Sequence, residues 1–387
     1  MTSQRRSNAF SGDRKWVAAV IIISIAAAGV LVTLRRRTDA GRAAKAQALG
    51  KVLRQLHERT PEAVDRLAVK QGLNIHSLLS SKAASDIWNS DAIAKAQRVI
   101  NAAFKPMPMI NGHFTPVLLD DDPAGPVLSP GDAQALDRLG ASVARVEYFS
   151  GGSWKLRGTA FVAGSGTAVT NCHVVAADQG PVPTLQPGAL RLDFGQTNIG
   201  SDEDRFAVTA ILPCPQRTGF DVAFLSVAGR SADSSRPLPP ALHLMRVKPD
   251  AAALPPGSNV WLVGYPDLPD SDEPLYQQLH ALSPSYAKIA TPGFFQTLDH
   301  SKGFDYVLHN GTSDSGNSGS PLFGLRTQGL IGVDHCCYDT LVRQPSGVLP
   351  LPCAFVFGQA YFNESIAAWE VWNDPTLGPQ LNATAGL

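Results

Sequence analysis

Short apolar runs separated by Gly, Pro, Asp and Ser dominate the chain from residue 140 onward. Many such runs at close intervals are typical of an all-β sandwich or barrel. A turn-rich stretch at 229–240 divides the runs into two sets of similar size. The pattern predicts a mainly β domain over residues 138–372, closed by a helix over residues 363–372. The expected strands cover residues 142–148, 158–163, 190–194, 206–212, 221–227, 242–247, 260–264, 306–308, 330–333 and 354–357.

Apolar positions recur at helical spacing across residues 38–105, which predicts a helical stalk or a small helical subdomain. One of its helices is expected over residues 90–104, with Asn89 or Ser90 as the cap. Residues 106–137 combine many prolines with a run of aspartates, which is typical of an irregular linker or an extended strap.

An uncharged apolar stretch occupies residues 16–34, after a polar N-terminal tail of residues 1–15. A helix of this length spans about 28 Å, close to the hydrocarbon thickness of a bilayer. Arginines follow it directly, where a signal peptide would carry its small-residue cleavage site. We therefore expect an uncleaved, single-pass transmembrane helix.

Composition excludes other classes of function. Basic and acidic residues number 33 each, so the formal net charge is zero, whereas nucleic-acid-binding domains usually carry a basic surplus. No Cys-x-x-Cys pair or Cys/His cluster has the spacing of a zinc site. We expect no nucleic-acid partner, and we expect a chemistry that needs neither metal nor cofactor. The oligomeric state stays open.

The strongest chemical signal is GNSGSP at residues 316–321, which places Ser318 in a glycine-rich turn. Such a turn exposes the hydroxyl and lets backbone N–H groups converge on one point, as a developing oxyanion requires. Ser315 also precedes a glycine, but it lacks the following small residue and proline. Ser318 is therefore the preferred nucleophile.

Two further segments supply a base and an acid. His173 follows two apolar strands, and a strand end holds an imidazole rigidly, as a general base requires. Asp221 opens an otherwise apolar strand. A partly desolvated carboxylate needs a partner there, and an imidazole N–H is a suitable one.

Together these segments resemble the chymotrypsin-like (trypsin-fold) serine peptidases over about residues 140–372. They look closest to the bacterial trypsin-like branch that includes the glutamyl endopeptidases. The order His173, Asp221, Ser318 is the order found in that family. The resemblance implies two antiparallel β-barrels of the six-stranded type with a C-terminal helix, preceded here by the transmembrane helix and the helical stalk.

The resemblance also implies a serine endopeptidase that acts on a polypeptide through an acyl-enzyme. In it, Ser318 attacks, His173 transfers the proton and Asp221 orients the imidazole. The backbone N–H groups of Gly316 and Ser318 hold the oxyanion. Asn317 stands where the digestive enzymes have an aspartate, so no activation by an ion pair with a new N-terminus is expected.

The sequence leaves open which of two neighbouring residues, Asp334 or His335, determines substrate specificity. In the glutamyl endopeptidases, a threonine or serine and a histidine bind the substrate carboxylate; Ser313, next to Thr312, matches the first. The histidine position falls on Asp334, with His335 next to it, and strand alternation allows only one of them to face the pocket. Asp334 would repel a glutamate and favour a basic side chain, whereas His335 would preserve glutamate preference. A third alternative is that Asp334 faces solvent and takes no part in specificity.

The side of the membrane that holds the β domain also stays open. Basic residues are more numerous after residues 16–34 than before them, which favours a cytoplasmic domain by the positive-inside rule. The cysteines number five, an odd count, and are expected to be free thiols, which suit a reducing compartment. Against this, many trypsin-like peptidases work outside the cytoplasm.

A function of another class competes with the enzyme: a catalytically silent binding or sensing module on the same fold, held at the membrane. The sequence favours the enzyme, because all three candidate catalytic positions and both glycines are filled. An esterase is disfavoured, because its nucleophile motif belongs to an α/β fold.

Overall fold

The computed structural model describes most of the chain from residue 46 onward. The transmembrane helix expected at residues 16–34 lies outside the described residues. Within the described part, no helix is both long enough and apolar enough to cross a bilayer. The described residues are 46, 49–58, 61–80, 88–103, 106–115, 130–176, 185–195, 204–215, 217, 219–232, 234–266, 277, 287–300, 303–311, 313, 316–325, 327, 329–338 and 362–385.

Six antiparallel strands close into a first barrel, in the order β3-β4-β5-β8-β7-β6. Its interior holds alternate residues of each strand, as a small closed barrel requires. The strands are β3 (Val143–Ser150), β4 (Ser153–Gly164), β5 (Thr167–Thr170), β6 (Leu190–Asp193), β7 (Arg205–Ile211) and β8 (Ala223–Val227).

A second barrel follows the order β9-β10-β11-β14-β13-β12. Strand β10 pairs with both β9 and β11, and β12 pairs with β9, so these six strands also close. The expectation of two antiparallel six-stranded barrels is confirmed. The strands are β9 (Asn259–Gly264), β10 (Ile289–Asp299), β11 (Tyr306–His309), β12 (Pro321–Gly324), β13 (Gly329–Tyr338) and β14 (Phe362–Ala367).

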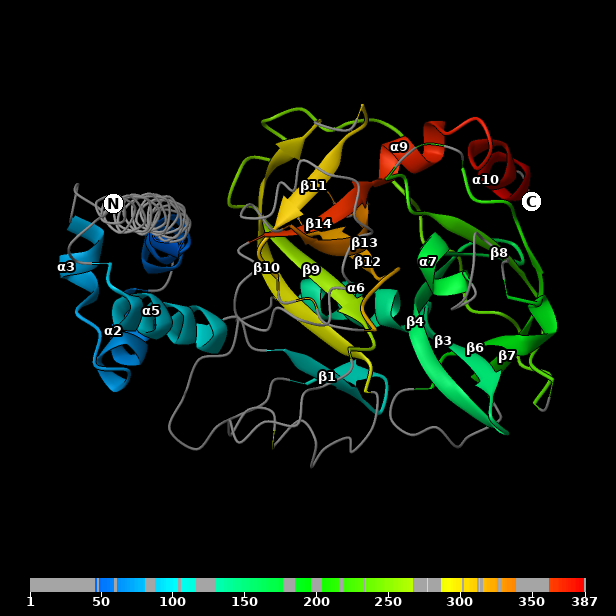
Figure 1. The fold of residues 1–387 in the computed structure, drawn as a ribbon, viewed down its shortest axis with the longest axis horizontal. Helices are drawn as coiled ribbons and strands as arrows, with labels where there is room; N and C mark the ends of the chain where they lie inside the picture. Colours follow the sequence, from blue (N-terminus) through cyan, green and yellow to red (C-terminus); the bar gives the residue numbers. More distant parts are fainter. Residues whose placement is uncertain are drawn as a thin grey trace, which may run out of the picture.

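The two barrels lie side by side, and the helical segment lies beyond the second barrel (Figure 1). An apolar cluster joins the barrels, with Phe161 and Phe224 from the first and Val263 and Phe323 from the second. The remaining short elements are α6 (Pro130–Ala141), α7 (Cys172–Val175), η1 (Pro187–Ala189), α9 (Ala368–Asn373) and α10 (Gly378–Ala385).

A buried polar joint also links the barrels. Lys288, just before β10, donates from Nζ to Gly140 O at 2.7 Å and to Phe194 O at 3.1 Å. Tyr265, just after β9, donates from its hydroxyl to Gly195 O at 2.7 Å. Burial lowers the pKa of Lys288 to about 7, against the opposing attraction of nearby carboxylates.

The region before the barrels is helical, as expected, over α2 (Pro61–Lys70), α3 (Ile75–Ser80) and α5 (Ser90–Ala103). Asn89 caps α5, because its Oδ1 accepts the Ala92 N–H at 2.8 Å. The apolar cluster of these helices includes Phe294 of β10, so the helices pack against the second barrel.

Three expectations about local structure were wrong. Residues 106–137 are not wholly irregular, because β1 (Met107–Ile110) and β2 (His113–Phe114) extend the second sheet and α6 begins at Pro130. Residues 242–247 contribute only an isolated bridge. Residues 363–367 belong to β14, so the C-terminal helix begins at Ala368.

Two further strands complete the comparison. The strand expected at residues 354–357 lies outside the described residues. The structure also contains a strand, β10, that the sequence pattern does not predict.

The expectation of free thiols was wrong for Cys172 and Cys214, which form a disulfide with a Cα–Cα distance of 6.0 Å. Cys172 follows β5 and Cys214 follows β7. Both strands pair with β8, one on each side, so the barrel brings together two cysteines that are 42 residues apart. The sequence alone gives no sign of this pairing.

Candidate active site

The short helix α7 carries His173 out of the first barrel. Val174, the next residue of this helix, is fully buried and anchors the helix to the barrel. Arg157 fixes the end of the helix, because its Nε donates to Val174 O at 2.7 Å and its Nη2 donates to Ala176 O. His173 therefore sits on a rigid turn, while its side chain stays 49% exposed.

Asp221, just before β8, holds His173 through two hydrogen bonds. Its Oδ1 accepts the His173 backbone N–H at 2.9 Å, and its Oδ2 accepts a hydrogen bond from Nδ1. Asn171 Nδ2 donates to Asp221 O at 2.6 Å, which fixes the backbone of the aspartate. Because Nδ1 carries the proton in this arrangement, Nε2 of His173 is available as a proton acceptor.

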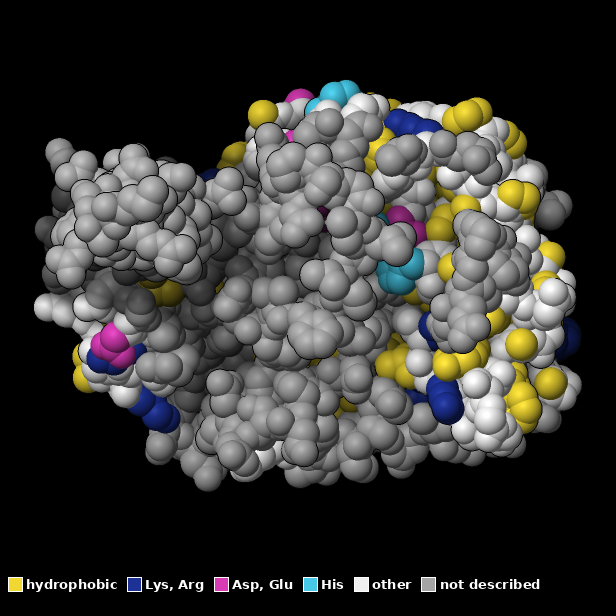
Figure 2. Space-filling view, viewed as in Figure 1, with side chains coloured by type: hydrophobic (Ala, Val, Ile, Leu, Met, Phe, Trp, Pro, Cys, Tyr) yellow, Lys and Arg dark blue, Asp and Glu magenta, His cyan; other side chains and the backbone are white. Residues whose placement is uncertain are grey.

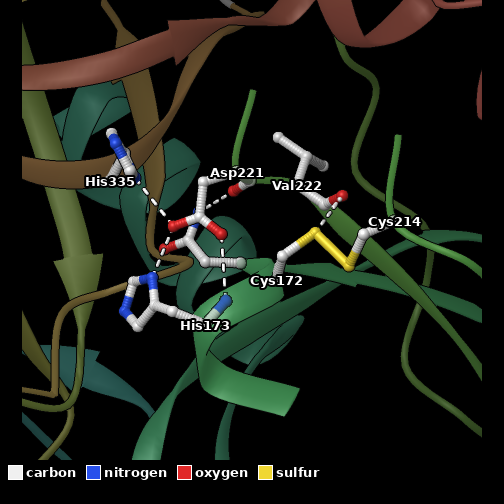
Figure 3. Close-up of a disulfide and its surroundings, with 7 residues drawn as sticks. Cys172, His173, Cys214, Asp221, Val222 and His335 are labelled. Atoms are coloured by element: carbon white, nitrogen blue, oxygen red, sulfur yellow. Dashed lines mark hydrogen bonds and ion pairs between the residues drawn. A yellow bond between two sulfur atoms is a disulfide. The ribbon is translucent and has the colours of Figure 1, made fainter. Parts of the chain in front are cut away.

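A second imidazole binds the same carboxylate. His335 Nδ1, on β13, donates to Asp221 Oδ2 at 2.8 Å, and the two rings approach the carboxylate from different sides (Figure 3). The ring centroids of His173 and His335 are 6.3 Å apart. The His335 ring also stacks on Tyr306 of β11. Asp221 therefore connects the first barrel to the second.

Burial by itself raises the pKa of the Asp221 carboxyl. The hydrogen bonds from His173 and His335 outweigh burial and hold the pKa well below its ordinary range. Asp221 is therefore ionised at neutral pH and can stabilise an imidazolium. Histidine and acidic side chains adjoin one another on the face of the molecule seen in Figure 2. His173, Asp221 and His335 also form a group able to hold a divalent cation.

Thr159 of β4 ties the turn that carries Ser318 to the first barrel. Its backbone N–H donates to Ser318 O at 2.8 Å, and its Oγ1 donates to Gly316 O at 2.7 Å. The same Oγ1 accepts the Tyr265 N–H at 3.1 Å. This fully buried threonine thus connects the serine turn with both barrels.

Gly158 lies between the serine turn and α7. A Cβ at this position would lie 2.7 Å from Val174 Cγ2 and 3.0 Å from Ser318 O. Since Val174 directly follows His173, Ser318 and the histidine helix flank the same glycine. Among the described contacts, Ser318 Oγ makes no hydrogen bond to His173, and such bonds often tighten only when substrate binds.

Two backbone donors of the serine turn have no acceptor among the described residues. Gly316 has φ +91° and Gly319 has φ +88°, a backbone conformation that favours glycine. Gly319 N–H donates to Asp334 O at 2.9 Å. Within the described part of the chain, the N–H groups of Gly316 and Ser318 have no hydrogen-bond acceptor. They are therefore available to an oxyanion.

Asp334 and His335 point to different partners, as strand alternation requires. The Asp334 carboxylate is buried, accepts Ser313 Oγ at 2.6 Å and lies 3.4 Å from His309 Nε2. Ser365 Oγ also donates to it at 3.5 Å. Asp334 therefore shares a polar cluster with Ser313, while His335 belongs to the Asp221 group.

Sequence analysis does not identify Thr159, which lies inside an expected strand and has no motif around it that indicates a chemical role. It identifies His335 only as a candidate for the substrate pocket, whereas the structure places His335 in contact with Asp221. Thr312 and Ser315 lie outside the described residues.

Residues 158–333, which include His173, Asp221 and Ser318, match the family model described as trypsin-like peptidase domain. No curated protein matches the chain. Similar solved structures include an active form of the Rv3671c protease from M. tuberculosis, with 17% identity and a TM-score of 0.39, covering 68% of this chain and 95% of that chain.

A Glu endopeptidase in complex with MPD has 12% identity and a TM-score of 0.40, covering 64% of this chain and 91% of that chain. The HtrA-type protease AlgW with decapeptide has 16% identity and a TM-score of 0.38, covering 61% and 63%. At these identities and scores, the structural similarities add nothing on substrate or mechanism. The family match agrees with the family expected from the sequence: residues 158–333 form a trypsin-like peptidase domain, which supports a serine endopeptidase activity.

Proposed function

We propose that Ser318, His173 and Asp221 are the catalytic triad of this endopeptidase. The main observation behind this proposal is that Asp221 accepts two hydrogen bonds from His173, one from the backbone N–H and one from Nδ1. This arrangement selects the tautomer whose Nε2 can take the Ser318 proton. It also leaves the aspartate ionised to stabilise the imidazolium.

In this mechanism, Ser318 Oγ attacks the scissile carbonyl while its proton passes to His173 Nε2. The unused N–H groups of Gly316 and Ser318 hold the oxyanion of the tetrahedral intermediate. The imidazolium then returns the proton to the leaving amine, and the acyl-enzyme forms. Water, activated by His173, hydrolyses the acyl-enzyme in the second half of the reaction.

The proposal is tested by hydrolysis of a fluorogenic peptide library. We expect cleavage that disappears in Ser318→Ala and His173→Ala, and that persists in Ser315→Ala, the matched control three residues earlier in the sequence. Cleavage that survives Ser318→Ala would overturn the assignment. A folded chain that cleaves no peptide would instead support a silent binding module.

We further propose that the enzyme disfavours glutamate and prefers lysine or arginine before the cleaved bond. The support is the Asp334 carboxylate, which accepts a hydrogen bond from Ser313, another residue expected in the substrate pocket. A negative charge there repels an acidic side chain and attracts a basic one.

This preference is tested by kcat/KM for peptides that differ only in Lys, Arg, Gln or Glu at that position. We expect Asp334→Asn to lower the ratio of basic to acidic cleavage by about tenfold or more. A wild-type preference for glutamate would refute the role of Asp334 and leave the triad untouched.

We also propose that residues 16–34 tether the enzyme to a membrane, with the peptidase domain in an oxidising compartment. The apolar length supports the tether, and the Cys172–Cys214 disulfide supports the compartment. Removal of residues 1–37 should release the enzyme from washed membranes. If a thiol-alkylating reagent modifies Cys172 in freshly harvested cells, the cysteine is a free thiol there, and this would contradict the assignment of the compartment.

A further inference from the structure

Two imidazoles and a carboxylate converge in the helical segment, apart from the peptidase site. His57 lies in the helix at 49–58, Asp65 in α2 and His76 in α3. The Nε2 atoms of His57 and His76 lie 3.0 Å and 3.6 Å from the same oxygen, Asp65 Oδ1. The three ligand atoms all lie within 4.8 Å of one another.

We propose that His57, Asp65 and His76 bind a divalent cation of the zinc class. Around tetrahedral zinc, with bonds of about 2.0–2.2 Å, neighbouring ligand atoms are about 3.3–3.5 Å apart. The two nitrogen-to-oxygen separations lie on either side of this value. Two nitrogen ligands and one oxygen ligand favour Zn²⁺, Co²⁺ or Ni²⁺ over Mg²⁺ and Ca²⁺, which prefer oxygen.

The apolar core of the segment holds all three ligands in place. Each ligand directly follows a buried apolar residue, so its backbone is anchored while its side chain reaches the rim of the core. These residues are Leu56, Val64 and Ile75, which are 6%, 0% and 3% exposed. The His57 and His76 rings pack edge to face, with centroids 5.4 Å apart. Such support lowers the entropic cost of gathering the ligands.

The charge around Asp65 also suits a cation. Within the described part of the chain, no lysine or arginine pairs with Asp65, whose only partners are the two imidazoles. Asp65 is 38% exposed and His76 74% exposed, so an ion can enter and water can complete its coordination. Three protein ligands and an open position are a common zinc arrangement.

A second group of similar composition differs, because its carboxylates already pair with basic side chains. His300, Asp305 and Glu370 also lie close together, but Lys248 Nζ is 2.9 Å from Asp305 and Arg217 Nη2 is 3.6 Å from Glu370. These cations already neutralise the carboxylates. The site at His57, Asp65 and His76 is therefore the better candidate of the two.

Binding would join three helices between the expected membrane segment and the barrels. No sequence motif indicates this site, because the ligands come from three helices with irregular spacing. The inference is independent of the catalytic triad and of the proposed substrate.

Isothermal titration of the purified full chain with Zn²⁺ tests the proposal, with Co²⁺ absorption as a report on tetrahedral geometry. We expect His57→Ala and His76→Ala each to weaken the affinity by about tenfold or more. Two variants should keep the wild-type affinity. His113→Ala removes an imidazole that pairs with Asp137 alone, and His335→Ala removes a ligand from the Asp221 group.

Circular dichroism of the metal-free variants shows whether they fold, and Asp65→Asn serves as a near-isosteric second test. Absence of Zn²⁺ binding to the wild-type chain would overturn the proposal. Wild-type affinity in folded His57→Ala and His76→Ala, or loss of binding only in His335→Ala, would overturn it as well.

Discussion

His335 and His173 donate to the same oxygen atom, Asp221 Oδ2, from opposite barrels. One carboxylate therefore receives a hydrogen bond from the candidate base and another from a second titratable side chain. The position and the charge of His335 must influence how strongly Asp221 stabilises the His173 imidazolium. The contact between the barrels is thus also a contact within the proposed catalytic triad.

Replacement of His335 by alanine should lower kcat/KM by about tenfold, because Asp221 loses one of the two imidazole donors that hold it and small displacements of reacting groups are costly. His335→Gln can still donate a hydrogen bond and should retain more activity than His335→Ala. Equal kcat/KM values for wild type and His335→Ala would show that the contact has no catalytic effect.

Thr159→Val should lower kcat/KM by about 10- to 100-fold, because small displacements of reacting groups are costly. Valine keeps the shape of threonine but cannot donate to Gly316 O or accept from Tyr265 N–H. Thr159→Ser keeps both bonds and should retain most activity. Equal activity of the valine and serine variants, measured with one peptide, would exclude a positioning role for Thr159.

Reduction of the Cys172–Cys214 disulfide should destabilise the first barrel. The bond closes a loop of 42 residues, which corresponds to about 4 kcal/mol of loop-closure free energy. Because Cys172 directly precedes His173, activity should fall along with stability. Thermal unfolding with and without dithiothreitol measures the effect, and Cys214→Ala should be insensitive to the reductant. An equal response of Cys214→Ala would point to another cause.

The lowered pKa of Lys288 predicts that the free energy of unfolding rises with pH between about 7 and 10.5. Below this window both states are protonated, and above it both are neutral. Within it, only the unfolded chain binds the proton, so raising the pH favours the folded state. Lys288→Met should flatten the slope of the unfolding free energy from urea titrations, whereas the exposed control Lys155→Met should not. Equal slopes in all three proteins would refute the burial argument.

The sequence predicted the barrels, and it indicated the three candidate triad residues, because the signals for both are local. GNSGSP at 316–321 and the strand before His173 each lie within a few residues. Strand β10 was missed because Pro292 and Gly293 interrupt its apolar run. Residues 363–367 were read as helix, because apolar residues there fit either period. Their pairing with β11 and β13 decides in favour of a strand.

Contacts between distant segments could not be predicted. The Cys172–Cys214 disulfide depends on the barrel order, and the choice between Asp334 and His335 depends on the strand register. Thr159 gains its importance only because the serine turn reaches it from more than 150 residues away. In each case, the residue type was visible but its partner was not.

The most direct test of the triad is labelling of the full chain with a fluorophosphonate, followed by mass spectrometry of the modified peptide. Fluorophosphonates react with serines activated by a neighbouring base. The account predicts a single adduct on Ser318 that is lost in Ser318→Ala, strongly slowed in His173→Ala and retained in Ser315→Ala. An adduct on Ser315, or no adduct in a folded wild-type chain, would contradict it.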